Sequence, residues 1–140
     1  MQHDYDLQRF VTAQADSYET ALTEIKRGAK RSHWMWYIFP QLAGLGTSPM
    51  ARHYAIGSIE EAKAYLGHPL LGPRLLACIE ALQALPPTPA EKVFGDIDAK
   101  KLRSSLTLFM TAGGGPIFEQ ALRRWFAGQA DDATLKLLSK

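Results

Sequence analysis

The segment 34–39 limits the possible folds more than any other part of the chain. It places four aromatic residues in six positions, namely Trp34, Trp36, Tyr37 and Phe39. A segment that is apolar on nearly every side must be buried on most sides, so the remaining chain has to enclose it. We expect Ser32 to cap a helix over residues 33–39. Pro40 should end that helix, because the residue before a proline disfavours helical backbone.

Apolar residues elsewhere recur at helical spacing. Representative stripes are Leu7, Phe10 and Val11; Tyr18, Ala21, Leu22 and Ile25; Leu75, Cys78, Ile79 and Leu82; and Phe118, Ala121, Leu122 and Trp125. No run alternates apolar with polar residues over the length of a strand, and no hairpin turn separates two such runs. We therefore predict an all-α fold with no sheet, built from about eight short helices. A single domain over residues 1–140 suits this length.

Local signals predict where several helices start and stop. The expected caps are Asp16 or Ser17, Ser48 before Pro49, Ser58 with Glu61 three positions on, and Asp131 or Asp132. Gly28 is the expected stop of the second helix. Gly72 and Pro73 are expected to kink or restart the helix that contains them. The basic residues 26, 27, 30 and 31 follow a helix end, where a solvated cationic cap explains most of them.

Composition narrows the functional classes. The chain is 46% hydrophobic and carries 16 basic and 14 acidic residues, a formal charge of +2, so nucleic acid is not an expected partner. One cysteine, Cys78, rules out an intramolecular disulfide. No stretch has the roughly twenty apolar residues of a membrane span, and the first residues lack a signal-peptide pattern. We expect a cytoplasmic protein, and no pattern indicates its oligomeric state.

Three groups of residues together resemble a known family. They are residues 30–48, the run Tyr65-Leu66-Gly67-His68-Pro69 with Leu71 and Gly72, and the run Phe94-Gly95-Asp96-Ile97-Asp98 with Lys101, Ser104 and Ser105. The chain resembles a bacterial family, with members in fungi, of small all-α proteins of unknown function, some of which carry the label calpastatin. The resemblance covers nearly the whole chain. It implies a helical fold and no catalytic residue.

The aromatic segment also holds candidate ligand-binding groups. Trp36 and Tyr37 could stack on a flat ring, and both need polar partners when buried. In a helix, His33 would share a face with Tyr37, at the i, i+4 spacing, and with Trp36. A histidine beside aromatic rings and the cation of Lys30 could act as a general base near neutral pH. Lys30 is itself a candidate contact for a negatively charged ligand. The alternative is plain packing, with His33 bonded to backbone at the helix start.

A loop containing glycines follows this segment and runs into the start of the next helix. Backbone N–H groups at a helix start attract anions, which makes Gly44, Gly46 and Ser48 candidate ligand contacts. Gln41 could read a hydrogen-bonding edge, and Arg52 could add positive charge. The loop lacks the Gly-Lys-Ser/Thr ending of a P-loop and the third glycine of a dinucleotide fingerprint, so no cofactor is indicated. A plain loop is the alternative.

One helix face further along the chain contains Asp98, Lys101 and Ser105, spaced i, i+3 and i+7. Asp98 is a candidate acid or base, and Lys101 and Ser105 are candidate ligand contacts. The alternative is an ion pair between Asp98 and Lys101 on an ordinary helix surface. No Ser-Lys hydrolase signature is present. The histidines are spaced too widely for a helical metal site, so no metal is expected.

These residue types together favour a pocket for a small anionic molecule resembling a nucleotide or ADP-ribose. Hydrolysis of that molecule would require His33 or Asp98 as acid or base. The alternative is a module that binds or regulates another protein without catalysis. The sequence leaves open whether the protein is an enzyme.

Overall fold

The computed structural model describes residues 5–139, and this range contains nine α-helices joined by loops. They are α1 (Gln8–Ala15), α2 (Tyr18–Arg27), α3 (Met35–Ile38), α4 (Pro49–His53), α5 (Ile59–Gly67), α6 (Leu71–Gln83), α7 (Ala90–Thr111), α8 (Pro116–Phe126) and α9 (Asp132–Leu138). Within this range the backbone pairs in strand fashion only at an isolated parallel bridge between Leu42 and Ile56. The all-α prediction is confirmed.

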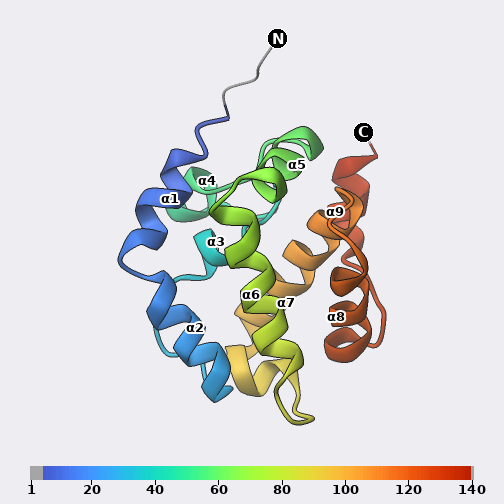
Figure 1. Ribbon diagram of the computed structural model, residues 1–140. Helices are drawn as coiled ribbons and strands as arrows, with labels where there is room; N and C mark the ends of the chain where they lie inside the picture. Colours follow the sequence, from blue (N-terminus) through green and yellow to red (C-terminus); the bar gives the residue numbers. More distant parts are fainter. Residues whose placement is uncertain (1–4, 140) are drawn as a thin grey trace.

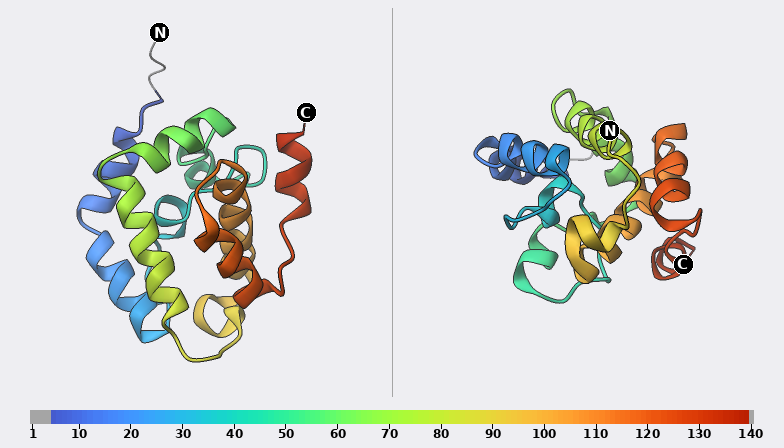
Figure 2. Two further views of the ribbon diagram at one scale, coloured as in Figure 1. Left: turned by 45° about the vertical axis from the view of Figure 1, so that its right-hand side comes forward. Right: turned by 90° about the horizontal axis from the view of Figure 1, so that it is seen from below.

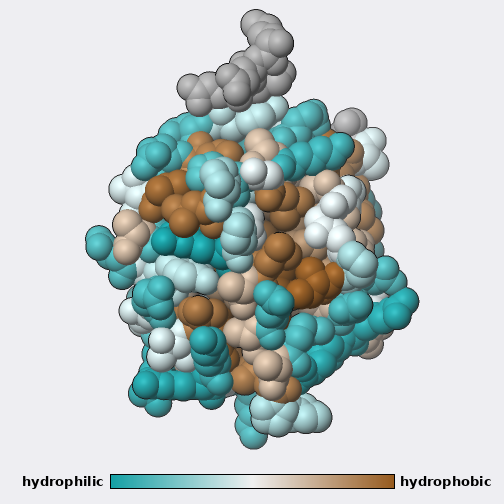
Figure 3. All heavy atoms as spheres, in the orientation of Figure 1, coloured by the Kyte–Doolittle hydropathy of each residue, from teal (hydrophilic) through white to brown (hydrophobic). Residues whose placement is uncertain are grey.

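The helices α6 and α7 run through the middle of the molecule. Figures 1 and 2 show α1 and α2 on one side of this pair and α8 and α9 on the other. On the face seen in Figure 3, polar areas separate the apolar ones. No helix within residues 5–139 is long and apolar enough to cross a bilayer.

The aromatic segment lies inside this arrangement. Trp34 and Phe39 are each 1% exposed, so the prediction that both are buried is confirmed. Phe94 packs edge-on against both rings, at centroid distances of 6.4 Å from Trp34 and 6.3 Å from Phe39. The helix here is α3, which is shorter than the predicted span of residues 33–39.

Two serines that were expected to cap helices bind distant partners instead. Ser17 Oγ accepts a hydrogen bond from Tyr37 Oη at 3.0 Å, and Ser32 Oγ donates to Glu24 Oε2 at 2.6 Å. Ser17 is the N-cap residue of α2, but its side chain makes no capping hydrogen bond, and the N-cap residue of α3 is Trp34 in place of Ser32. The start of α2 was therefore predicted correctly, and the two capping bonds were not. A side chain that finds a partner far along the chain is unavailable to its own helix end.

The remaining predicted helix ends are correct in most cases. Ser48, Ser58 and Asp131 accept the backbone N–H three positions on, at 3.1, 3.1 and 3.0 Å. Gly28 ends α2 with a φ of 70°, the left-handed conformation that glycine adopts easily. The expected restart at Gly72 and Pro73 is wrong. Both lie in the first turn of α6, where a proline costs no helical hydrogen bond.

An ion pair joins α1 to α5. The Arg9 guanidinium lies 3.0 Å from Glu61 Oε2 and also donates to the carbonyls of His53 and Ala55, at 2.9 and 2.8 Å. The other Glu61 oxygen accepts the N–H of Gly57 at 2.8 Å. These bonds hold the chain before α5 against α1.

The single thiol of the chain lies in the core. Cys78 is a buried residue of α6. Burial raises the pKa of its thiol from 9.0 to about 12, since the charged thiolate is disfavoured away from water, and Arg74 offsets only part of this rise. At neutral pH the thiol is therefore protonated and unreactive.

Candidate functional site

A buried carboxylate fixes the start of the aromatic segment. Glu24 accepts four hydrogen bonds, from the N–H groups of Arg31 and Ser32 at 2.8 and 2.9 Å, from Ser32 Oγ and from Trp34 Nε1 at 2.9 Å. Burial raises the pKa of Glu24, but these four donors outweigh it and lower the pKa from 4.5 to about 2. The turn over residues 31–34 is therefore held by a carboxylate that the sequence analysis did not single out.

Lys30 lies beside this turn and is not a solvated helix cap. Its side chain is 7% exposed, and Nζ contacts Asp98 Oδ2 at 2.9 Å and donates to Ser32 O at 2.6 Å. The ammonium group also lies 4.9 Å from the centre of the Trp34 ring. The expectation of a solvated cation fails for Lys30 because Asp98, distant in sequence, is its partner.

Asp98 links Lys30 to a second lysine. Its Oδ1 lies 3.5 Å from Lys101 Nζ, which confirms the i, i+3 ion pair. The Lys101 ammonium group lies 5.3 Å from the centre of the Trp36 ring. Four of the predicted site residues, Lys30, Trp36, Asp98 and Lys101, therefore form one connected row.

Gln41 is fixed through both its backbone and its side chain. Its carbonyl accepts the N–H of Ile56 at 2.8 Å, and the carbonyl of Ile56 accepts the N–H of Ala43 at 2.8 Å. Its side-chain Nε2 donates to Ser104 Oγ on α7 at 3.1 Å. Residues 41–43 are thus attached to α7 on one side and to residue 56 on the other.

A surface hollow opens where these residues meet. We call it the Gln41–Lys101 hollow; it measures about 260 Å³ and is lined by Gln41, Leu45, Gly46, Ile97, Lys100, Lys101, Ser104, Asp131 and Ala133. Its walls come from the loop after α3, from α7 and from the start of α9. It contains two lysines, one carboxylate, and the neutral polar side chains of Gln41 and Ser104. Oδ2 of that carboxylate, Asp131, accepts hydrogen bonds from Thr134, so the two lysines leave the lining with a net positive charge suited to an anion that also forms hydrogen bonds.

A smaller hollow of about 150 Å³ shares Gln41 and Gly46 and adds Gly44 and Arg52. The local structure disfavours a side chain at both glycines. Gly44 has a φ of 102°, and a Cβ on Gly46 would lie 2.6 Å from Ala51 Cβ. The Ser48 hydroxyl caps α4. These contacts support the plain-loop alternative for residues 44–48.

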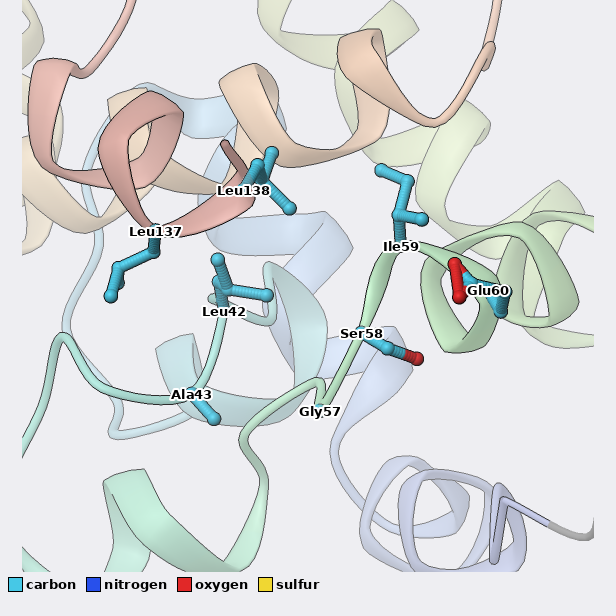
Figure 4. A pocket seen from close by; sticks show the side chains of 8 residues that line it. All are labelled: Leu42, Ala43, Gly57, Ser58, Ile59, Glu60, Leu137 and Leu138. Carbon is cyan, nitrogen blue, oxygen red and sulfur yellow. The ribbon is translucent and has the colours of Figure 1, made fainter. Parts of the chain in front are cut away.

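A third hollow, shown in Figure 4, is lined by leucine and isoleucine side chains together with the polar residues Ser58 and Glu60. It measures about 350 Å³ and lies between residues 42–43, the start of α5 and the end of α9. Leu42 and Leu138 point toward each other in this view. The Ser58 hydroxyl at its edge already caps α5. This hollow brings together none of the predicted site residues.

Of the twelve predicted site residues, only Gln41, Gly46 and Lys101 line the Gln41–Lys101 hollow. Tyr37 packs against Tyr54 at a centroid distance of 5.3 Å, and its hydroxyl binds Ser17. His33 is exposed and does not line the hollow, and its carbonyl faces Tyr37 Oη at 3.4 Å. Ser105 is 1% exposed, and its Oγ has no hydrogen-bond partner among residues 5–139.

The expected shared face of His33, Trp36 and Tyr37 is not formed. The helix begins only at Met35, so the i, i+4 geometry does not apply to residue 33. Trp36 faces Lys101 on α7, whereas Tyr37 faces the junction of α1 and α2. The aromatic segment therefore divides its side chains between two sides.

Sequence reasoning missed three polar residues of the hollow, Lys100, Ser104 and Asp131, and its three apolar residues. Ser104 is three positions after Lys101, and this spacing could have placed it on the same helix face. Asp131 was assigned only as a helix cap. Asp131 also lines the hollow, and this depends on how α9 packs against α7. Among residues 5–139, no group of three or more His, Cys, Asp or Glu side chains is placed to hold a metal ion.

Comparison with known proteins gives the chain a family. It is similar to a solved structure described as the conserved hypothetical protein Rv1873 from Mycobacterium tuberculosis, with 46% identity, a TM-score of 0.95, and coverage of 97% of this chain and 98% of that one. A search of curated proteins gave no match. Residues 4–138 match the family described as Protein of unknown function (DUF1810). The chain belongs to that family.

Proposed function

We propose that this protein binds a small anionic molecule, resembling a nucleotide or ADP-ribose, in the Gln41–Lys101 hollow. The observation that carries the proposal is the meeting of Lys100, Lys101, Gln41 and Ser104 in one hollow of about 260 Å³. Lysine ammonium groups attract phosphate and carboxylate, and the Gln41 amide, which is bonded to Ser104, can form directed hydrogen bonds. Segments some 60 positions apart supply these groups.

The charge around Lys101 supports an anionic ligand. Lys30 and Lys101 share the single carboxylate of Asp98, so this row keeps an excess of positive charge. Asp98 and the Trp36 ring hold the Lys101 ammonium group beside the hollow. A cation already held in position loses less side-chain entropy when a ligand binds.

Binding has more support than hydrolysis. Each oxygen of Asp98 contacts a lysine, an arrangement that suits holding Lys101 in place. His33 would have to act on a part of the ligand that extends beyond the hollow. A hydrolytic step through His33 or Asp98 is therefore the less supported form of the proposal.

A thermal-shift assay with ADP-ribose, AMP and ribose 5-phosphate tests the proposal. A ligand at a hundred times its Kd adds about 2.7 kcal/mol of stability, which raises the Tm of a domain of this size by several degrees. Lys101→Ala should remove most of that shift. Lys63→Ala is the matched control, because Lys63 is an exposed lysine on α5. The proposal fails if no probe shifts the Tm or if Lys101→Ala responds like the wild type.

The alternative function is a protein-interaction or regulatory module without catalysis. Ile97 favours it, because this large apolar side chain is 72% exposed at the edge of the same hollow. The preceding break at Gly95, with φ 83° and ψ 166°, helps present residues 96–98 on the surface. The alternative gains support if every anionic probe fails in the thermal-shift assay.

A further inference from the structure

A chain of polar side chains crosses the floor of the Gln41–Lys101 hollow. Gln41 Nε2 lies 3.1 Å from Ser104 Oγ, which lies 3.3 Å from Thr134 Oγ1. Thr134 Oγ1 in turn lies 2.6 Å from Asp131 Oδ2. Ser104 and Thr134 are buried, and the two ends, Gln41 and Asp131, both line the hollow.

The number of hydrogens gives this chain a direction. A hydroxyl group has only one hydrogen to donate. Thr134 uses its hydrogen for the carboxylate of Asp131, because a 2.6 Å bond to a charged oxygen is much stronger than a 3.3 Å contact with a neutral one. Ser104 must therefore donate to Thr134, and Ser104 Oγ is left to accept from Gln41.

This direction also decides how the Gln41 amide is turned. If Gln41 Oε1 faced Ser104, the Ser104 hydrogen would be drawn to it. Ser104 and Thr134 would then face each other without a hydrogen between them, inside the protein. Unpaired buried lone pairs are costly, so the amide is held with Nε2 toward Ser104 and Oε1 away from it.

The amide oxygen of Gln41 is consequently left for a ligand. Among residues 5–139, Ser105 Oγ is the only buried side-chain polar atom without a partner, so Gln41 Oε1 reaches solvent. The oxygen is an acceptor and cannot donate. Gln41 lines both this hollow and the smaller one that contains Arg52, so its acceptor lies among the cations of Lys100, Lys101 and Arg52.

Resting on the proposed anion site, we infer that Gln41 determines its specificity, selecting anionic molecules that also carry an N–H donor. A molecule with phosphate near the lysines and an exocyclic amine or carboxamide near Gln41 satisfies both parts of the hollow. A ligand that presents only acceptors would displace solvent from Gln41 Oε1 without replacing the lost hydrogen bond. Its own acceptor would also be repelled by that oxygen.

Isothermal titration with two probes of equal charge tests this inference. AMP carries an exocyclic amine, and purine riboside 5′-monophosphate lacks it. We expect wild-type protein to bind AMP about tenfold more tightly, the effect of one hydrogen bond. Gln41→Met has no hydrogen-bonding group and should remove the difference. Lys101→Ala should weaken both probes and leave their ratio unchanged.

The outcomes separate this inference from the proposed function. If neither probe binds, the anion site itself is absent and both proposals fall. Equal binding of the two probes by wild-type protein would overturn the inference about Gln41 and leave the anion site standing. An unchanged ratio in Gln41→Met, with its circular dichroism spectrum preserved, would also overturn it.

Discussion

Two polar networks border the aromatic segment, and they differ in how completely their atoms are used. At the start of the segment, Glu24 accepts four hydrogen bonds and is only 8% exposed. At its end, Gln41 uses Nε2 for Ser104, and its Oε1 remains accessible to solvent. The first network is closed, and the second is open.

The difference indicates which of the two can serve a ligand. A closed network stabilises a turn, since every donor and acceptor already has a partner inside the protein. An open network has fixed geometry and unused hydrogen-bonding capacity, which are the two requirements of a binding site. The predictions below test whether the two networks differ in this way, starting with the largest expected effect.

The largest effect should come from the aromatic core beside the closed network. Trp34→Ala should lower the free energy of unfolding by about 3–5 kcal/mol, because it empties a core position and leaves Glu24 without one donor. Phe39→Ala should fall in the same range. Gln41→Met should cost under about 1 kcal/mol, the contribution of a single hydrogen bond. Urea unfolding measures all three, and a Trp34→Ala midpoint close to that of the wild type would show that this segment is not the core.

A smaller effect should appear in the dependence of stability on pH. The pKa of Glu24 is about 2 in the folded protein, below its ordinary value of 4.5. Its contribution to the free energy of unfolding is therefore present above pH 4.5 and is lost as the pH falls toward 2. Glu24→Gln should be less stable at pH 7 and should lose less stability between pH 5 and pH 2. Parallel curves for the two proteins would contradict the closed network.

The smallest of the three effects concerns the row formed by Lys30, Asp98, Lys101 and Trp36. Lys30→Met keeps the length of the side chain but removes the 2.9 Å partner of Asp98, and should cost about 1–2 kcal/mol. Lys26→Met is the matched control, because Lys26 is an exposed lysine in the last turn of α2. It should change the stability by less than about 0.5 kcal/mol. Equal losses in the two variants would mean that Lys30 is an ordinary surface cation.

Most of the fold was predictable from the sequence because its signals are local. The cap at Ser58 and the stop at Gly28 depend on residues within one helical turn, and both were predicted correctly. The capping bonds assigned to Ser17 and Ser32 were wrong because their hydroxyls bind residues 20 and 8 positions away. Those partners are decided by packing, which a local pattern does not contain.

The candidate site was predictable only as a set of residue types. Lys30 was interpreted as a solvated cap because its partner Asp98 is remote in sequence. Asp98 and Lys101 share one helix face, so their pairing could be predicted from spacing alone. The approach of Gln41 to Ser104 depends on the bridge at residues 42 and 56, for which the sequence carries no strand signal.

Chemical labelling of the buried Cys78 thiol can measure how often the core around α6 opens. The thiolate is the form that attacks a thiol-specific reagent, and in the folded protein the sulfur of Cys78 is buried and almost entirely protonated. Labelling must therefore wait for α6 to separate from its neighbours. When the protein recloses faster than the reagent reacts, the labelling rate depends on the equilibrium constant for opening. When enough reagent is present for labelling to be faster than reclosing, the labelling rate equals the opening rate. Because the chain has one cysteine, each modified molecule records one such event without an introduced probe.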